Sequence, residues 1–217
     1  MAAVGQTIPI GCQKLSCAHG ATTGGARGVD SEFAKHLNFG QARAMQHTDW
    51  AENFRVIYLH TVAAYRAGQR DPATICTPEQ TAFLASIGCS PQEIFDFAED
   101  GCLGGEPAFE TVLLITAVRR DYLLVEQAGR PSGKVIDAGQ LPAKSAELGG
   151  IAWLPRIIQK AGAKLRGEMP PELMYGCGGD RPFLRSVNIH PADFLRLVWS
   201  VKGDPQKVLA FVHRSGA

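Results

Sequence analysis

Signals for the start and end of helices recur along the chain from about residue 49. Thr77-Pro78-Glu79-Gln80 reads as a capping box with Pro at the first helical position, and Ser90-Pro91 repeats the Pro start. Gly or Pro follows most of the segments between such starts. Predicted helices span 50–67, 78–88, 91–101, 107–127 and 154–165, and two more begin at Pro191 and Pro205. The pattern predicts an all-α fold, an irregular bundle of seven or eight helices.

The predicted helix 107–127 is apolar on every side at 100° per residue. A helix of this kind is surrounded by other elements, so we expect it to be the buried central helix of the bundle. It nevertheless carries Glu110, Arg119, Arg120 and Asp121. Because burying a charge is costly unless the charge is paired, each of these groups must reach the helix end, pair inside or face a ligand cavity.

The rest of the chain adds little regular structure. The best strand candidate is 133–137, and residues 1–30 hold six glycines, which predicts a flexible Gly-rich N-terminal segment before a single helical domain over 31–217. With 217 residues, of which 45% are apolar, the chain can bury a core without disulfides. The basic cluster 160–166 has helical spacing and is interpreted as a solvated face.

Charge and cysteine content limit the partners and the compartment. The net charge is +1 without blocks of like charge, so nothing favours nucleic acid. No stretch is apolar for long enough to predict a membrane helix, and the N-terminus lacks the basic lead of a secretory signal. Six scattered cysteines are typical of reduced thiols. We therefore expect a cytoplasmic protein that does not bind a membrane.

A candidate reactive loop lies at 175–181. Cys177 is a candidate nucleophile, Asp180 is a further catalytic candidate, and Arg181 and Tyr175 are candidate ligand-binding residues. The alternative is a tight turn with Asp180 capping and Arg181 pairing to it. The glycines at 20–28 and 176–179 lack the strand–turn–helix setting of a phosphate loop, so no nucleotide-binding motif is present.

A single divalent metal is a further hypothesis. His47, His60 and Glu110 are the candidate ligands, because helix bundles build metal sites from inward His and Glu. The competing interpretation is that these are ordinary helix residues. Cys12, Cys17 and His19 form a weaker metal candidate, while Cys76, Cys89 and Cys102 are interpreted as small buried hydrophobes beside helix ends.

A family resemblance rests on the C-terminal third. Trp153-Leu154-Pro155-Arg156, Lys160, Lys164 and the run 175–183 resemble the bacterial domain of unknown function 5069 family, most clearly over 150–212. The resemblance implies a small bacterial intracellular protein. It brings no activity, cofactor or catalytic residue.

Two classes of function remain. The leading hypothesis is a small-molecule enzyme or ligand-binding domain whose polar pocket is lined by Arg119, Arg120 and Asp121, with the loop 175–181 near its mouth. Arginines in an apolar setting favour an anionic ligand, and Asp121 is then a catalytic candidate. The alternative is a non-enzymatic helical adaptor or a homo-oligomeric interaction module.

Overall fold

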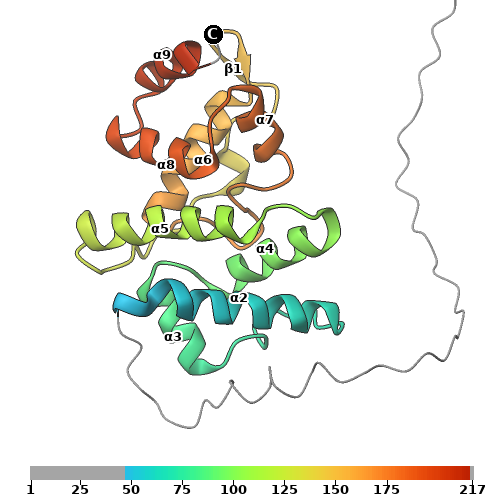
Figure 1. The fold of residues 1–217 in the computed structure, drawn as a ribbon. Coiled ribbons are helices and arrows are strands. Elements are labelled where there is room, and N and C mark those ends of the chain that lie inside the picture. Colours follow the sequence, from blue (N-terminus) through green and yellow to red (C-terminus); the bar gives the residue numbers. More distant parts are fainter. Residues whose placement is uncertain (1–46, 216–217) are drawn as a thin grey trace, which may run out of the picture. The chain divides into compact units, whose positions relative to one another are not determined.

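The computed structural model describes residues 47–215, which form helices and one very short hairpin (Figure 1). The α-helices are α2 (Trp50–Arg66), α3 (Pro78–Ser86), α4 (Pro91–Gly104), α5 (Phe109–Val125), α6 (Leu154–Arg166), α7 (Asp180–Ser186), α8 (Pro191–Ser200) and α9 (Pro205–Ser215). Two 3-10 helices (His47–Asp49 and Ala138–Gln140) and an antiparallel pair, β1 (Glu147–Leu148) and β2 (Ile151–Ala152), complete these residues. The prediction of an all-α fold is confirmed. The segment 1–30, with Cys12, Cys17 and His19, lies outside the described residues.

Helix starts follow the predicted caps. Thr77 Oγ1 accepts a hydrogen bond from the Gln80 backbone at 3.2 Å, and Gln80 Oε1 accepts one from the Thr77 N–H at 2.9 Å. Ser90 Oγ accepts from the Glu93 backbone in the same manner. The predicted end of α4 at Gly101 is wrong, because the helix continues to Gly104 and stops at Gly105 with a φ of 71°. A glycine inside a helix is tolerated, whereas a positive φ ends it.

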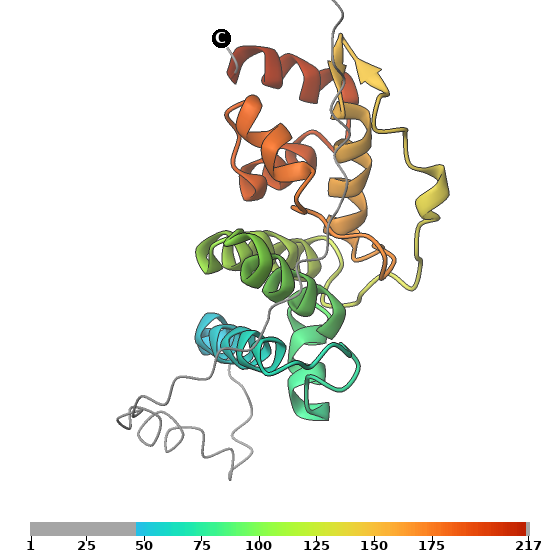
Figure 2. The same cartoon turned by 90° about the vertical axis from the view of Figure 1, so that its right-hand side faces the viewer.

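The central helix is α5, which lies between α2 on one side and α6 and α8 on the other (Figures 1 and 2). Val112, Ile115 and Val118 of α5 are fully buried in the main core. The prediction that this helix is surrounded on every side is wrong, however, since Leu124 is 39% exposed and Val125 is 70% exposed. The neighbouring helices cover two sides of α5, so part of its apolar surface faces solvent.

Helix α6 corrects a second prediction. The basic cluster 160–166 is not a solvated face, because Lys160 and Lys164 are both buried. They share a face of the helix with Ile157 and Ala161, which are also buried. Their charges must therefore be compensated inside the molecule.

Between α5 and β1 the chain runs without a long helix or strand. The predicted strand at 133–137 is absent. Among the residues that the structure describes, this stretch makes a single backbone hydrogen bond to a distant residue, from the Ile136 N–H to the Glu168 carbonyl at 2.9 Å. One such contact is too few to build a strand pair. Within residues 47–215, none of the helices has the length and apolar character needed to span a membrane.

Candidate functional site

A cavity of about 440 Å³ is lined by the start of α4, the end of α6 and Arg119 of α5. Its polar side chains include Ser90, Gln92, Glu93, Asp96, Arg119, Lys164 and Tyr175. Its apolar wall is formed by segments that follow α5 and α6, and includes Pro131, Met169, Pro170, Leu173 and Met174. Convergent polar groups in a mostly apolar setting are typical of small-molecule sites.

Arg119 is the most unusual residue of this cavity. It is 1% exposed, and its Nη1 donates to Gln127 Oε1 at 2.8 Å. Its Nε has no hydrogen-bond partner, and no carboxylate among residues 47–215 forms an ion pair with it. Loss of solvent lowers the pKa of Arg119 from its ordinary value, although arginine at this position still stays protonated at neutral pH. The cavity thus contains a buried cation without a contacting counter-ion.

Two glycines make room for the Arg119 side chain. A Cβ atom on Gly88 would lie 3.0 Å from Arg119 Nε, and one on Gly167 would lie 2.5 Å from Nη2. Both glycines have positive φ and follow the ends of α3 and α6. Because the C-terminal end of a helix is partly negative, these two helix ends offset a share of the Arg119 charge.

The second cation of the cavity is already neutralised. Lys164 Nζ forms an ion pair with Glu93 Oε1, and both side chains are largely buried. Glu93 lies in the first turn of α4, where the positive end of the helix dipole also favours its carboxylate. Arg119 is therefore the cavity cation whose charge is left for another group.

Asp96 supplies a carboxyl group without an ion pair among the described residues. Gln92 Nε2 donates to Asp96 Oδ1 at 2.7 Å. Burial raises the pKa of Asp96 to about 6, and the nearby Glu93, Glu99 and Asp100 carboxylates act in the same direction. At neutral pH the group is mostly ionised, and it accepts a proton under mildly acidic conditions.

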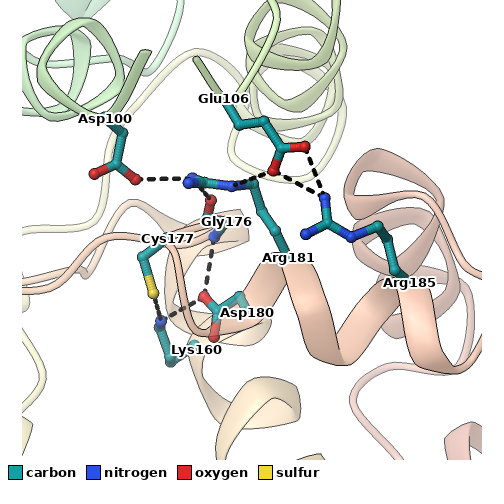
Figure 3. Close-up of polar contacts among 8 residues, drawn as sticks. All are labelled: Asp100, Glu106, Lys160, Gly176, Cys177, Asp180, Arg181 and Arg185. Carbon is teal, nitrogen blue, oxygen red and sulfur yellow. Dashed lines mark hydrogen bonds and ion pairs between the residues drawn. The ribbon is translucent and has the colours of Figure 1, made fainter. Parts of the chain in front are cut away.

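The loop at 175–181 is anchored by Asp180, as Figure 3 shows in part. Asp180 is fully buried and accepts hydrogen bonds from Lys160 Nζ at 2.5 Å, Trp153 Nε1 at 3.0 Å and the Gly176 N–H at 3.0 Å. Lys160 Nζ also lies 3.5 Å from Cys177 Sγ. These contacts satisfy Asp180 internally, so they account for the buried Lys160 and fasten the loop to α6.

Arg181 links the same loop to the end of α4 (Figure 3). Its Nη1 donates to Asp100 Oδ2 and to the Gly176 carbonyl, both at 2.8 Å, and its Nε lies 3.6 Å from Glu106 Oε2. The alternative in which Arg181 pairs with Asp180 is therefore wrong. Its carboxylate partners are distant in sequence, which is why the local pattern did not indicate them.

Tyr175 connects this anchored loop to the cavity. Its ring lines the cavity wall, and its hydroxyl donates to the Pro191 carbonyl at 2.8 Å. Full burial raises the pKa of Tyr175 well above its ordinary value, so the hydroxyl stays neutral. The structure thus brings together Arg119 and Tyr175, two of the candidates chosen from the sequence.

The other candidates lie elsewhere. The Arg120 guanidinium lies 5.1 Å from the centre of the Trp50 ring and 3.9 Å from the exposed Asp121 carboxylate, and neither Arg120 nor Asp121 lines the cavity. His60 and Glu110 are exposed, and the side chain of His47 lies outside the described part. Within that part, no three His, Cys, Asp or Glu side chains gather as a metal site would require.

Sequence reasoning missed the cavity residues Lys164, Glu93 and Asp96 and the two glycines at 88 and 167. Only Lys164 left a readable signal, because it falls on the apolar face of α6. Glu93 was not indicated as the partner of Lys164, because an ion pair between residues 71 positions apart leaves no local pattern.

Part of the chain is similar to a known family. Residues 140–217 match the family model described as Domain of unknown function (DUF5069), which confirms the resemblance seen over 150–212. No curated protein and no solved structure matches the chain. The matched range contains Lys164 and Tyr175 but excludes α4 and α5, so the cavity combines residues from inside and outside it.

Proposed function

We propose that this protein binds a small anionic molecule in the cavity beside Arg119. The observation that supports this most strongly is the buried Arg119 guanidinium, which has no ion-pair partner among residues 47–215 and an Nε without a hydrogen bond. Arginine N–H groups hold carboxylates and phosphates through short charge-assisted hydrogen bonds.

The cost of burying Arg119 favours a bound anion over a purely structural role for this side chain. Removing a guanidinium from water costs several kcal/mol even after the protein relaxes. One hydrogen bond to Gln127 and two helix ends return only a part of this cost. An anion entering the cavity would supply the missing opposite charge, in surroundings where charge pairs interact more strongly than in water.

The cavity walls also suit a small molecule. Tyr175 and the prolines at 131 and 170 form rigid surfaces, while Met169 and Met174 adapt to different shapes. A volume of about 440 Å³ falls in the range of ordinary ligand sites. Lys164 contributes little free charge because Glu93 neutralises it.

The test is a calorimetric titration of the full chain with short carboxylates, alkyl phosphates and sulfate. Wild type and Arg119→Gln are compared with Arg120→Gln, which removes the same charge from the next residue outside the cavity. Binding by wild type and Arg120→Gln that falls at least about tenfold in Arg119→Gln supports the proposal, since a charged hydrogen bond contributes that much or more. Equal affinities in the two variants, or no binding of any anion to wild type, would refute it.

A further inference from the structure

We infer that the ligand is a monocarboxylate with an apolar body, bound by its carboxylate at Arg119 and by its body against Met169, Leu173 and Met174. This inference rests on the proposed function and names the chemical class of the ligand.

The charges of the cavity wall favour a single negative charge. Glu93 neutralises Lys164, and the Asp96 carboxylate has Gln92 as its hydrogen-bond donor. Among the described residues, no anion contacts the remaining cation, Arg119. A dianionic phosphate would bring a second negative charge toward Glu93 and Asp96, and no free cation of the cavity would compensate it. A monoanion meets less repulsion from these two carboxylates than a dianion does.

The donors available at Arg119 also fit a carboxylate. Gln127 accepts one of the five guanidinium N–H groups, from Nη1, and among residues 47–215 the Nε N–H has no hydrogen-bond partner. Nε and Nη2 lie along one edge of the guanidinium. A single edge of a guanidinium matches the two oxygens of a carboxylate. Phosphate groups offer three oxygens and are usually held by several donors. Gly88 and Gly167 pack closely against the guanidinium, because a Cβ at either position would touch it.

The remainder of the wall is apolar. Met169, Leu173 and Met174 lie in the segment after α6, and Pro131, Pro170 and Pro171 add further apolar surface. The partly buried Met169 and Met174 pack against the main core, which holds this side of the cavity in place. A ligand made only of a carboxylate would leave these apolar surfaces exposed to water, whereas an aliphatic or aromatic body would cover them.

Five probes separate charge, head group and body. Hexanoate, acetate, hexanamide, hexyl phosphate and inorganic phosphate are titrated into the full chain, with Arg120→Gln and Arg119→Gln run in parallel. We expect hexanoate to bind about tenfold or more tighter than acetate, because each buried methylene adds affinity. Wild type should bind hexanoate more tightly than hexanamide and hexyl phosphate by a similar factor. The Arg119→Gln variant should bind hexanoate and hexanamide with equal affinity.

Other binding results would overturn separate parts of the inference. Tighter Arg119-dependent binding of hexyl phosphate or phosphate overturns the carboxylate assignment and leaves anion binding at Arg119 intact. Equal affinities for acetate and hexanoate overturn the apolar body. If no probe binds in an Arg119-dependent way, the proposed function fails as well.

A second variant guards against misfolding of Arg119→Gln. Leu173 is half-buried on the cavity wall in a loop, so Leu173→Glu retains the guanidinium and adds a carboxylate where the body would lie. This variant should bind hexanoate at least about tenfold more weakly than wild type, since burying an unpaired charge against an apolar body is costly. Leu173→Met is the matched control and should bind like wild type. Unchanged affinity in Leu173→Glu would refute the assigned position of the body.

Discussion

Replacing Arg119 with Met should leave the ligand-free protein as stable as wild type, or more stable. Within residues 47–215 no anion contacts the guanidinium, which is 1% exposed, so wild type bears a desolvation cost of several kcal/mol that Met does not. Met removes the hydrogen bond to Gln127, worth about 1.5–3 kcal/mol for a charged donor. It also removes attraction to the ends of α3 and α6, worth about 0.3–1 kcal/mol each. The net expectation is a change between zero and a gain of about 2 kcal/mol in the free energy of unfolding.

Urea unfolding followed by circular dichroism measures this difference, provided that the slope with denaturant is unchanged. Arg120→Met is the matched control. It removes a neighbouring guanidinium that lies over the Trp50 ring, so it should lower stability by about 0.5–1 kcal/mol. A loss of about 3 kcal/mol or more in Arg119→Met would refute the reasoning, since losses of that size follow when a well-compensated buried charge pair is broken.

Three further changes test the surroundings of the buried guanidinium. Gly167→Ala should unfold at a lower urea concentration than Gly105→Ala. Both glycines have a φ of 71°, but only a Cβ at 167 meets the guanidinium, and such overpacking costs about 1–3 kcal/mol. Equal losses of stability in the two variants would contradict the close packing at Gly167. Burial raises the pKa of Asp96 above its unfolded value to about 6, so its contribution to stability is full below pH 4 and is lost as pH rises through 6. Asp96→Asn should therefore be more stable than wild type at pH 8, by about 1–2 kcal/mol, and equally stable at pH 3.5. A difference in the free energy of unfolding that does not change with pH would exclude the ionisation of Asp96 as its cause. Glu93→Gln leaves Lys164 buried without its partner and should cost about 3–5 kcal/mol in thermal or urea unfolding, whereas a loss below about 1 kcal/mol would mean that Lys164 reaches solvent.

Local signals predicted the helices well because helix ends are decided within a few residues. The capping box at Thr77 and the Pro start at Pro91 needed no information from the rest of the chain. Helix α7 was missed because its seven residues, Asp180–Ser186, follow a glycine-rich turn and carry no side-chain cap. Sequence alone cannot separate such a turn from a short helix.

The candidate site was predicted only in part, for a physical reason. Arg119 stood out because a charge in an otherwise apolar helix must be accounted for. Arg120 met the same criterion, yet it lies over the Trp50 ring outside the cavity, a contact that depends on how α2 packs against α5. Glu93 was not predicted as the partner of Lys164, because 71 residues separate them and only the fold brings them together.

The most direct test of anion binding by Arg119 is a crystal structure of the chain grown with hexanoate. We expect the carboxylate within hydrogen-bonding distance of the Arg119 guanidinium and the alkyl chain against Leu173 and Met174. Hexanoate bound at another place, or a cavity filled only by ordered water at saturating hexanoate, would contradict it.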